Sequence, residues 1–100
     1  LDAAYLIPFK AKAWMDLTNR KAAGEHVDSK NIKEHKNDVF RLTELIDPMV
    51  KITAPQGVYA DIQDFIQKMQ NESIDIKQLE LVGRMKDQVL DELKDLYIAQ

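Results

Sequence analysis

The sequence predicts an all-α protein, a small bundle of four or five helices in a single domain. Its 100 residues include only three glycines and three prolines, and most stretches are rich in Ala, Leu, Lys, Glu, Gln and Asp, which favour helices. No stretch alternates apolar and polar residues over enough positions to indicate a strand, and residues 50–53 are the nearest candidate. With 45% apolar and 31% charged residues, the composition is that of a globular protein and excludes a disordered tail.

The first helix is expected to begin near Pro8, because proline suits the first turn of a helix, where the N–H that it lacks would be unpaired anyway. An additional turn starting from Asp2 is the alternative. The helix is expected to run to about Ala23, because Gly24 supplies a residue that readily adopts the left-handed conformation at a helix end.

The second helix is expected over about residues 30–46. Asp28 and Ser29 precede it, and both residue types are good N-caps. Pro48 ends it, because the residue before a proline avoids the helical region of backbone conformation.

Two further helical stretches follow a connector at about residues 49–56. The third helix is expected over about residues 57–70, where Val58, Ile62, Phe65, Ile66 and Met69 form one apolar stripe. Residues 71–73 are a linker or turn. The last helical stretch is expected over about residues 75–98, with a possible break near Gly83.

Composition also excludes several classes of protein. With no cysteine, the chain cannot hold a disulfide scaffold, a zinc–thiolate site or a thiol nucleophile. A net charge of −3 does not call for a nucleic-acid or anionic-membrane partner, although a local basic patch is compatible with it. No apolar run approaches the ~18 residues of a membrane span, so a cytoplasmic location without membrane contact is expected. Since Leu1 opens almost directly into helical sequence without an initiator Met, we expect a piece of a longer polypeptide.

A lysine stands inside the predicted apolar arc of the first helix. On a helical wheel with Leu6 at zero, that arc contains Phe9, Ala13, Trp14 and Leu17. Lys10 falls at about 40°, within the arc, and Lys12 falls at about 240°, toward the polar side. One explanation is snorkelling, in which the aliphatic stem packs and the ammonium reaches water. The other is a cation held at a cleft to meet an anionic ligand such as phosphate.

The second helix has a similar feature. Its apolar face is made by Ile32, Val39, Leu42 and Ile46, and His35 falls within that face. Asp38 lies on the flank, three residues after His35, so the two side chains are within reach of each other. A partly buried histidine bonded to a carboxylate is the structural interpretation. The functional interpretation is a carboxylate held near a reaction centre, with Lys36 and Arg41 supplying positive charge around it.

Other common site patterns are absent from the sequence. Gly24, Gly57 and Gly83 each stand alone, so there is no glycine-rich phosphate loop. The two histidines, His26 and His35, do not have the spacing of a zinc site. Basic residues gather on the second helix and at the end of the first, which would suit a nucleic-acid adaptor or simply a solvated face; they are Arg20, Lys21, Lys30, Lys33, Lys36 and Arg41.

The stretch from Tyr5 to Leu42 resembles a known family. The segments LIPFKAKAW (residues 6–14) and DSKNIKEHKNDVFRL (residues 28–42) resemble the C-terminal helical part of nucleotidyltransferase-like proteins of the AbiEii/AbiGii abortive-infection toxin class. That family carries a Lys-x-x-Ala helix, matched here by Lys10 to Ala13, and a second helix with a basic residue followed by an aspartate. Here Asn37 separates Lys36 from Asp38, whereas the two are usually adjacent in the family.

The resemblance implies a function for these residues. It implies that a mixed α/β nucleotidyltransferase core precedes this segment in the same chain, and that carboxylates of that core hold Mg²⁺ and a nucleoside triphosphate. Lys10 would then neutralise phosphate charge, with Lys12 as the reserve candidate. Asp38 would orient the acceptor hydroxyl, hold Lys10 or act as a base.

Further contacts and partners are implied by the same resemblance. His35, Lys36 and Arg41 would lie on the substrate side, with Arg41 as a possible phosphate contact. An antitoxin or an RNA acceptor would be the partner, and this segment alone would be inactive, since the family's Gly-Ser signature and metal-binding aspartates are absent from it. The rival hypothesis is a non-catalytic structural or partner-binding helical domain of a bacterial protein, in which Lys10 and Asp38 form a half-buried salt bridge and nothing more.

Overall fold

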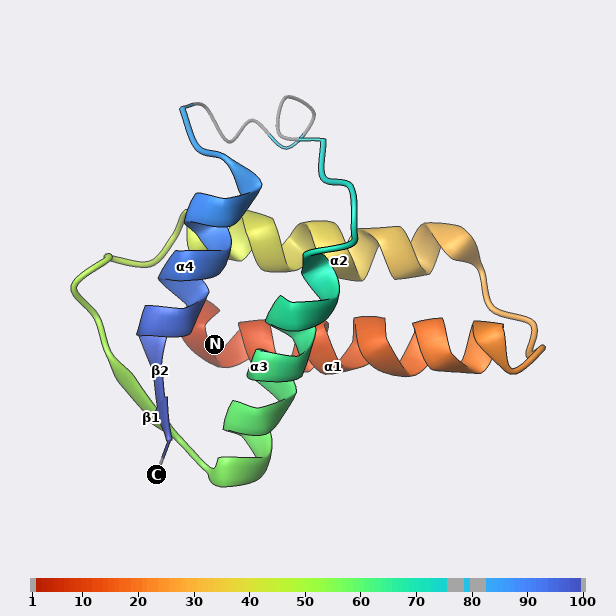
Figure 1. Cartoon of the computed structure of the whole chain (residues 1–100), viewed down its shortest axis with the longest axis horizontal. Coiled ribbons are helices and arrows are strands. Elements are labelled where there is room, and N and C mark those ends of the chain that lie inside the picture. Colours follow the sequence, from red (N-terminus) through yellow and green to blue (C-terminus); the bar gives the residue numbers. More distant parts are fainter. Residues whose placement is uncertain (1, 76–78, 80–82, 100) are drawn as a thin grey trace.

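The protein is described by a computed structural model that covers residues 2–75, 79 and 83–99. The expected all-α class is confirmed, since the described residues form a small bundle of four helices with only one short two-stranded sheet (Figure 1). In chain order the elements are α1 (Ala3–Ala22), α2 (Ser29–Thr43), β1 (Ile52–Ala54), α3 (Gln56–Met69), α4 (Lys86–Leu96) and β2 (Tyr97–Ala99).

Helices α1 and α2 form an antiparallel hairpin, and α3 and α4 run across it (Figure 1). The core lies where the four helices meet, and its largest fully buried side chains include Phe40, Phe65, Ile7, Ile62, Met69 and Leu93. Trp14 of α1 packs edge-to-face on Phe65 of α3, with ring centroids 5.6 Å apart and ring planes at 88°. This aromatic pair joins the hairpin to the second half of the chain.

Helix α1 begins at Ala3, so the alternative of an additional turn from Asp2 is confirmed and a start near Pro8 is wrong, since Pro8 lies inside the helix. The Asp2 carboxylate accepts a hydrogen bond from the Ala4 N–H at 3.1 Å and caps the helix. Proline has no N–H, so Pro8 cannot donate to the Ala4 carbonyl one turn earlier. The buried hydroxyl of Tyr97 donates to that carbonyl at 2.5 Å instead. A side chain from β2 therefore replaces the hydrogen bond that proline removes.

The expected signals at the loop between α1 and α2 are confirmed. Gly24 adopts the left-handed conformation, with a φ of 92°, directly after the C-cap residue Ala23 of α1. The Asp28 side chain accepts from the Lys30 N–H at 2.9 Å and caps α2. Helix α2 ends at Thr43, three residues before the expected Ile46, because the next residues form tighter turns in which each N–H bonds to the carbonyl three residues earlier.

Helix α3 matches its expected range to within one residue at each end. The strand β1 overlaps the candidate stretch at residues 50–53 and pairs in parallel with β2, in the register Ile52 with Tyr97 and Ala54 with Ala99. The expectation that the last helix reaches Ile98 is therefore wrong, since Tyr97 leaves the helix to pair with β1.

The N-terminal part of the last expected helical stretch falls partly outside the described residues, at 76–78 and 80–82. Gly83 adopts the left-handed conformation, with a φ of 76°, and α4 begins only at Lys86; the part of the expected helix directly before Gly83 lies outside the described residues, so the expected break is not tested. Among the residues that the structure describes, no helix combines the length and the apolar character needed to cross a bilayer.

Candidate functional site

The hairpin brings Lys10 of α1 and Asp38 of α2 into contact. Lys10 Nζ lies 3.1 Å from Asp38 Oδ2, and each side chain is about one-third exposed, at 33% and 32%. Arg41 Nη1 lies 3.4 Å from the other carboxylate oxygen of Asp38. We refer to Lys10, Asp38 and Arg41 as the Lys10–Asp38 cluster. Its two cations and one anion give it a net charge of +1.

The wheel that placed Lys10 inside the apolar arc is wrong in its orientation. The residues of α1 that are buried are Ala4, Ile7, Ala11, Trp14 and Met15. On the same wheel they centre at about 130°, so Lys10, at about 40°, stands at the edge of the buried stripe. Phe9, at about 300°, lies on the opposite side and is 70% exposed. Apolar residues occur on nearly every side of α1, so periodicity alone could not select the buried one.

The ion pair contributes little to stability, because both side chains are partly exposed to water. Exposed pairs of this kind contribute about 1 kcal/mol or less. The pair instead fixes a position, since Arg41 and Lys10 hold the carboxylate of Asp38 between α1 and α2. Among the described residues Lys10 has Asp38 as its only ion-pair partner, and an ammonium has three N–H groups. The remaining N–H groups can therefore meet an anionic ligand at the protein surface.

Two other lysines predicted for this site lie elsewhere. Lys12 Nζ is 3.5 Å from Asp61 Oδ2 of α3, on a different side of α1. Lys36 Nζ bonds Glu72 Oε1 at 3.1 Å and the Ser73 carbonyl at 3.2 Å, which ties α2 to the residues after α3. The sequence could not reveal these partners, because they lie 49 and 36 residues away from their lysines.

The predicted contact between His35 and Asp38 is not made. Asp38 is bound to Lys10 and Arg41, whereas His35 is half-buried and its Nδ1 has no hydrogen-bond partner among the described residues. His26 lies exposed in the loop before α2, as expected. Within the described ranges, no group of three or more His, Cys, Asp or Glu residues is placed to hold a metal ion.

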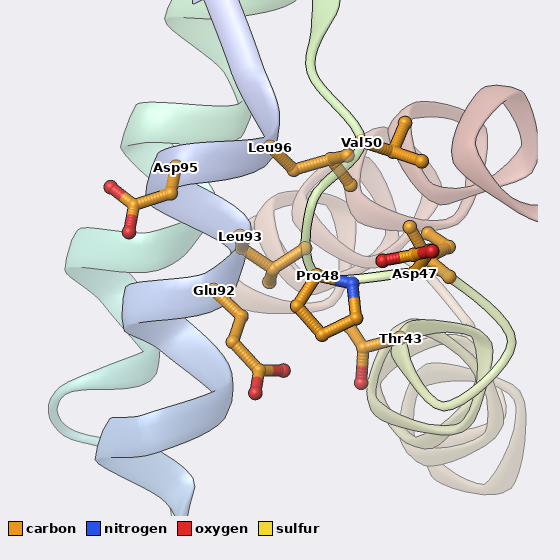
Figure 2. Close-up of a pocket in the computed structure, with 9 residues that line it drawn as sticks. Thr43, Asp47, Pro48, Val50, Glu92, Leu93, Asp95 and Leu96 are labelled. Carbon is orange, nitrogen blue, oxygen red and sulfur yellow. The ribbon is translucent and has the colours of Figure 1, made fainter.

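A cavity of about 130 Å³ lies between α4 and the chain that follows α2. Figure 2 shows Leu93 pointing toward Pro48, whereas the carboxylate of Asp95 points away from the cavity. The other two acids at the rim are occupied. The Asp47 carboxylate accepts from the Met49 N–H at 2.9 Å, and Glu92 pairs with Arg84. This cavity therefore offers an apolar floor but no free reactive group.

The sequence analysis missed a second hollow, of about 260 Å³, at the start of α1. Its walls are mostly apolar and come from α1, β1, β2 and the start of α3; they include Tyr5, Phe9, Ala54, Pro55, Val58 and Tyr97. Tyr5 is 57% exposed. The signal that could have found this hollow is the pair Tyr5 and Phe9, four residues apart and therefore on one side of a helix.

Comparisons with known proteins do not identify a family: no family model, no curated protein and no solved structure matches this chain. Function is therefore inferred from the Lys10–Asp38 cluster and from the resemblance carried by residues 5–42.

Proposed function

We propose that this chain is the helical C-terminal domain of a nucleotidyltransferase-like protein of the AbiEii/AbiGii toxin class. In this proposal it lends Lys10 and Asp38 to a cytoplasmic cleft for a nucleoside triphosphate and its acceptor. The observation that supports it is the contact between Lys10 and Asp38, whose side chains are each about one-third exposed and which come from the two helices that resemble the family. The N-terminal core of the same polypeptide would complete the cleft and hold Mg²⁺. An RNA acceptor and an antitoxin are the partners that the resemblance implies.

Each residue of the cluster has a role that its geometry allows. The Lys10 ammonium would neutralise charge on the phosphates, and such electrostatic stabilisation is a main contribution of the protein to phosphoryl transfer. Asp38, held by Arg41 at 3.4 Å, would orient the acceptor hydroxyl or accept its proton. Lys12 and Lys36 are engaged by Asp61 and Glu72, so we leave them outside this cleft.

The test is nucleotide transfer by the complete protein with Lys10→Ala. We expect transfer to fall about 100-fold, as when one charge-stabilising group is removed from an active site. The matched control is Lys68→Ala, because Lys68 also forms an exposed pair, with Asp64 at 2.7 Å, on α3. Both variants should melt within a few degrees of the unaltered protein. Unchanged transfer in Lys10→Ala would contradict the proposal.

A second candidate function is a structural or partner-binding helical domain. It is favoured by the fact that Lys10 and Asp38 neutralise each other, and by the exposed apolar hollow beside Tyr5 and Phe9. Under this alternative no nucleotide transfer depends on Lys10, and Lys10→Ala changes the melting temperature by only a few degrees, because the pair is partly exposed. The complete reading frame separates the two candidates at once, because only the first requires a Gly-Ser motif with paired aspartates upstream.

A further inference from the structure

An open hollow of about 490 Å³ lies at the end of the hairpin that carries the loop between α1 and α2. It lies between the second half of α1 and the first half of α2, and Trp14 lies at its inner wall. We call it the hairpin hollow. Lys10, Asp38 and Arg41 do not line it, so it is separate from the cluster described above.

Positive charge dominates the lining of the hairpin hollow. Three lysines line it, Lys21, Lys33 and Lys36, against one acid, Glu72. Lys36 is paired with that acid, and Lys21 donates to the neutral hydroxyl of Ser29. Lys33 has no ion-pair partner among the described residues. The charges of Lys21 and Lys33 are therefore not compensated within the hollow.

The charge of the whole chain has the same asymmetry. Residues 1–43 carry eight Lys and Arg against six Asp and Glu, a surplus of two positive charges. Residues 44–100 carry six against eleven, a surplus of five negative charges, which together give the net charge of −3. An anion is therefore attracted to the hairpin and repelled by the rest of the molecule.

A polar atom inside the hollow also lacks a partner. The hydroxyl oxygen of Thr18 is buried and makes no hydrogen bond to any described group, although Thr18 lines the hollow. Buried hydroxyl groups are nearly always satisfied by protein, water or a ligand. A ligand oxygen can satisfy it once a neighbouring side chain moves and opens the hydroxyl to the hollow, because the oxygen has almost no exposed surface in this structure.

We propose that the hairpin hollow binds a phosphate group. A phosphate offers several acceptor oxygens, which match two uncompensated ammonium groups and one unpartnered hydroxyl. The phosphate belongs either to a small molecule, such as a free nucleotide or pyrophosphate, or to the backbone of a nucleic acid. The inference does not depend on the proposed function, because none of the residues of the Lys10–Asp38 cluster takes part.

The first experiment is a titration of the protein with inorganic pyrophosphate at constant ionic strength. Trp14 is the sole tryptophan of the sequence and lines the hollow, so its fluorescence reports occupancy directly. We expect a saturable change, with the dissociation constant raised about 5- to 10-fold in Lys33→Gln, less than a buried charge-assisted contact would give, because Lys33 is exposed to solvent. Lys68→Gln is the control, because it removes the same charge from α3, and it should change the constant less than about 2-fold.

A variant without any change of charge provides the second test. Thr18→Val keeps the shape of the side chain and removes its hydroxyl, and we expect binding to weaken about 3-fold. A titration that does not saturate, together with no binding of the RNA oligonucleotides described next, would overturn the site. So would an equal loss in Lys33→Gln and Lys68→Gln with no loss in Thr18→Val, because this pattern indicates attraction by net charge alone.

The two sources of the phosphate are distinguished with labelled RNA oligonucleotides of 5 and 20 nucleotides, followed by fluorescence anisotropy. For a nucleic-acid backbone, affinity rises with length and falls with salt with a logarithmic slope of about −0.7 per phosphate contacted. For a small molecule, pyrophosphate binds and the oligonucleotides do not. Either result supports a phosphate site, whereas no binding of any of these probes would overturn it.

Discussion

The hairpin of α1 and α2 differs from the rest of the molecule in its net charge and in how many of its charged side chains have ion-pair partners. The hairpin has a surplus of positive charge. Among the described residues Lys10 pairs only with Asp38, and Lys33 has no ion-pair partner. In the remainder, acidic residues predominate and Asp61 and Glu72 are engaged with lysines of the hairpin. Both proposals above place the ligand-binding residues on the hairpin, and on that basis α3, α4 and the sheet are expected to contribute mainly to stability.

The largest effect is expected from the contact that joins the two regions. Phe65→Ala removes the fully buried ring that packs against Trp14 and should lower the free energy of unfolding by about 3–5 kcal/mol. Phe9→Ala is the control, because Phe9 is 70% exposed and its loss should change stability by less than about 1 kcal/mol. Urea denaturation measures both. Similar losses in the two variants would contradict the assignment of the core.

The second effect concerns the hydrogen bond from Tyr97 to the Ala4 carbonyl. Tyr97→Phe leaves that buried carbonyl without a donor, which should cost about 1–3 kcal/mol of stability. In a Pro8→Ala background the backbone N–H of residue 8 can donate to the same carbonyl, so Tyr97→Phe should cost less there. Urea denaturation of the four proteins gives the coupling energy. Strict additivity would contradict a shared carbonyl.

Alkaline pH should weaken the same contact. Burial of the Tyr97 hydroxyl, with the negative charge of Asp2 as a smaller cause, raises its pKa above the ordinary value. Because the pKa is raised in the folded state, the contribution to stability is complete below the unfolded pKa of about 10. Above that pH the free energy of unfolding should fall by up to about 1.4 kcal/mol per pH unit. Thermal melts between pH 8 and 11 should show a shallower fall for Tyr97→Phe, and identical slopes would refute this.

The smallest effect is expected from the Lys10–Asp38 pair. Asp38→Asn removes an exposed interaction and should lower stability by about 1 kcal/mol or less, with the difference shrinking in 1 M salt. Urea denaturation at low and high salt measures it. A loss above about 3 kcal/mol would instead indicate that the pair is part of the structural core.

Sequence signals among neighbouring residues predicted much of the fold, whereas features that depend on contacts between distant residues were not predicted. The cap at Asp28, the left-handed Gly24 and the apolar stripe of α3 depend on neighbouring residues, so their elements were placed closely. The start of α1 was harder to predict. The Ala4 carbonyl, which loses its helical hydrogen bond at Pro8, accepts one from the hydroxyl of Tyr97, 93 residues further along the chain. The strand β2 was missed for the same reason, since its pairing partner lies in β1.

In the candidate site, too, contacts between residues close in sequence could be predicted, whereas contacts between distant residues could not. Asp38 and Arg41 are three residues apart on one helix, so their contact follows from the sequence. The contact of Lys10 with Asp38 depends on the antiparallel pairing of α1 and α2, and the sequence left open whether it would be a plain salt bridge or part of a ligand cleft. The engagement of Lys12 and Lys36 by acids of the other region could not be predicted, because nothing local marks Asp61 or Glu72 as partners.

The most direct measurement replaces both members of the pair, as Lys10→Met with Asp38→Asn, in the complete protein, and compares nucleotide transfer with the free energy of unfolding. If the two charges serve a ligand, the double variant keeps nearly full stability and transfers nucleotide about 100-fold more slowly. Full transfer activity in a protein whose stability has fallen would mean that the contact between α1 and α2 is structural, and would contradict a functional role for the hairpin pair.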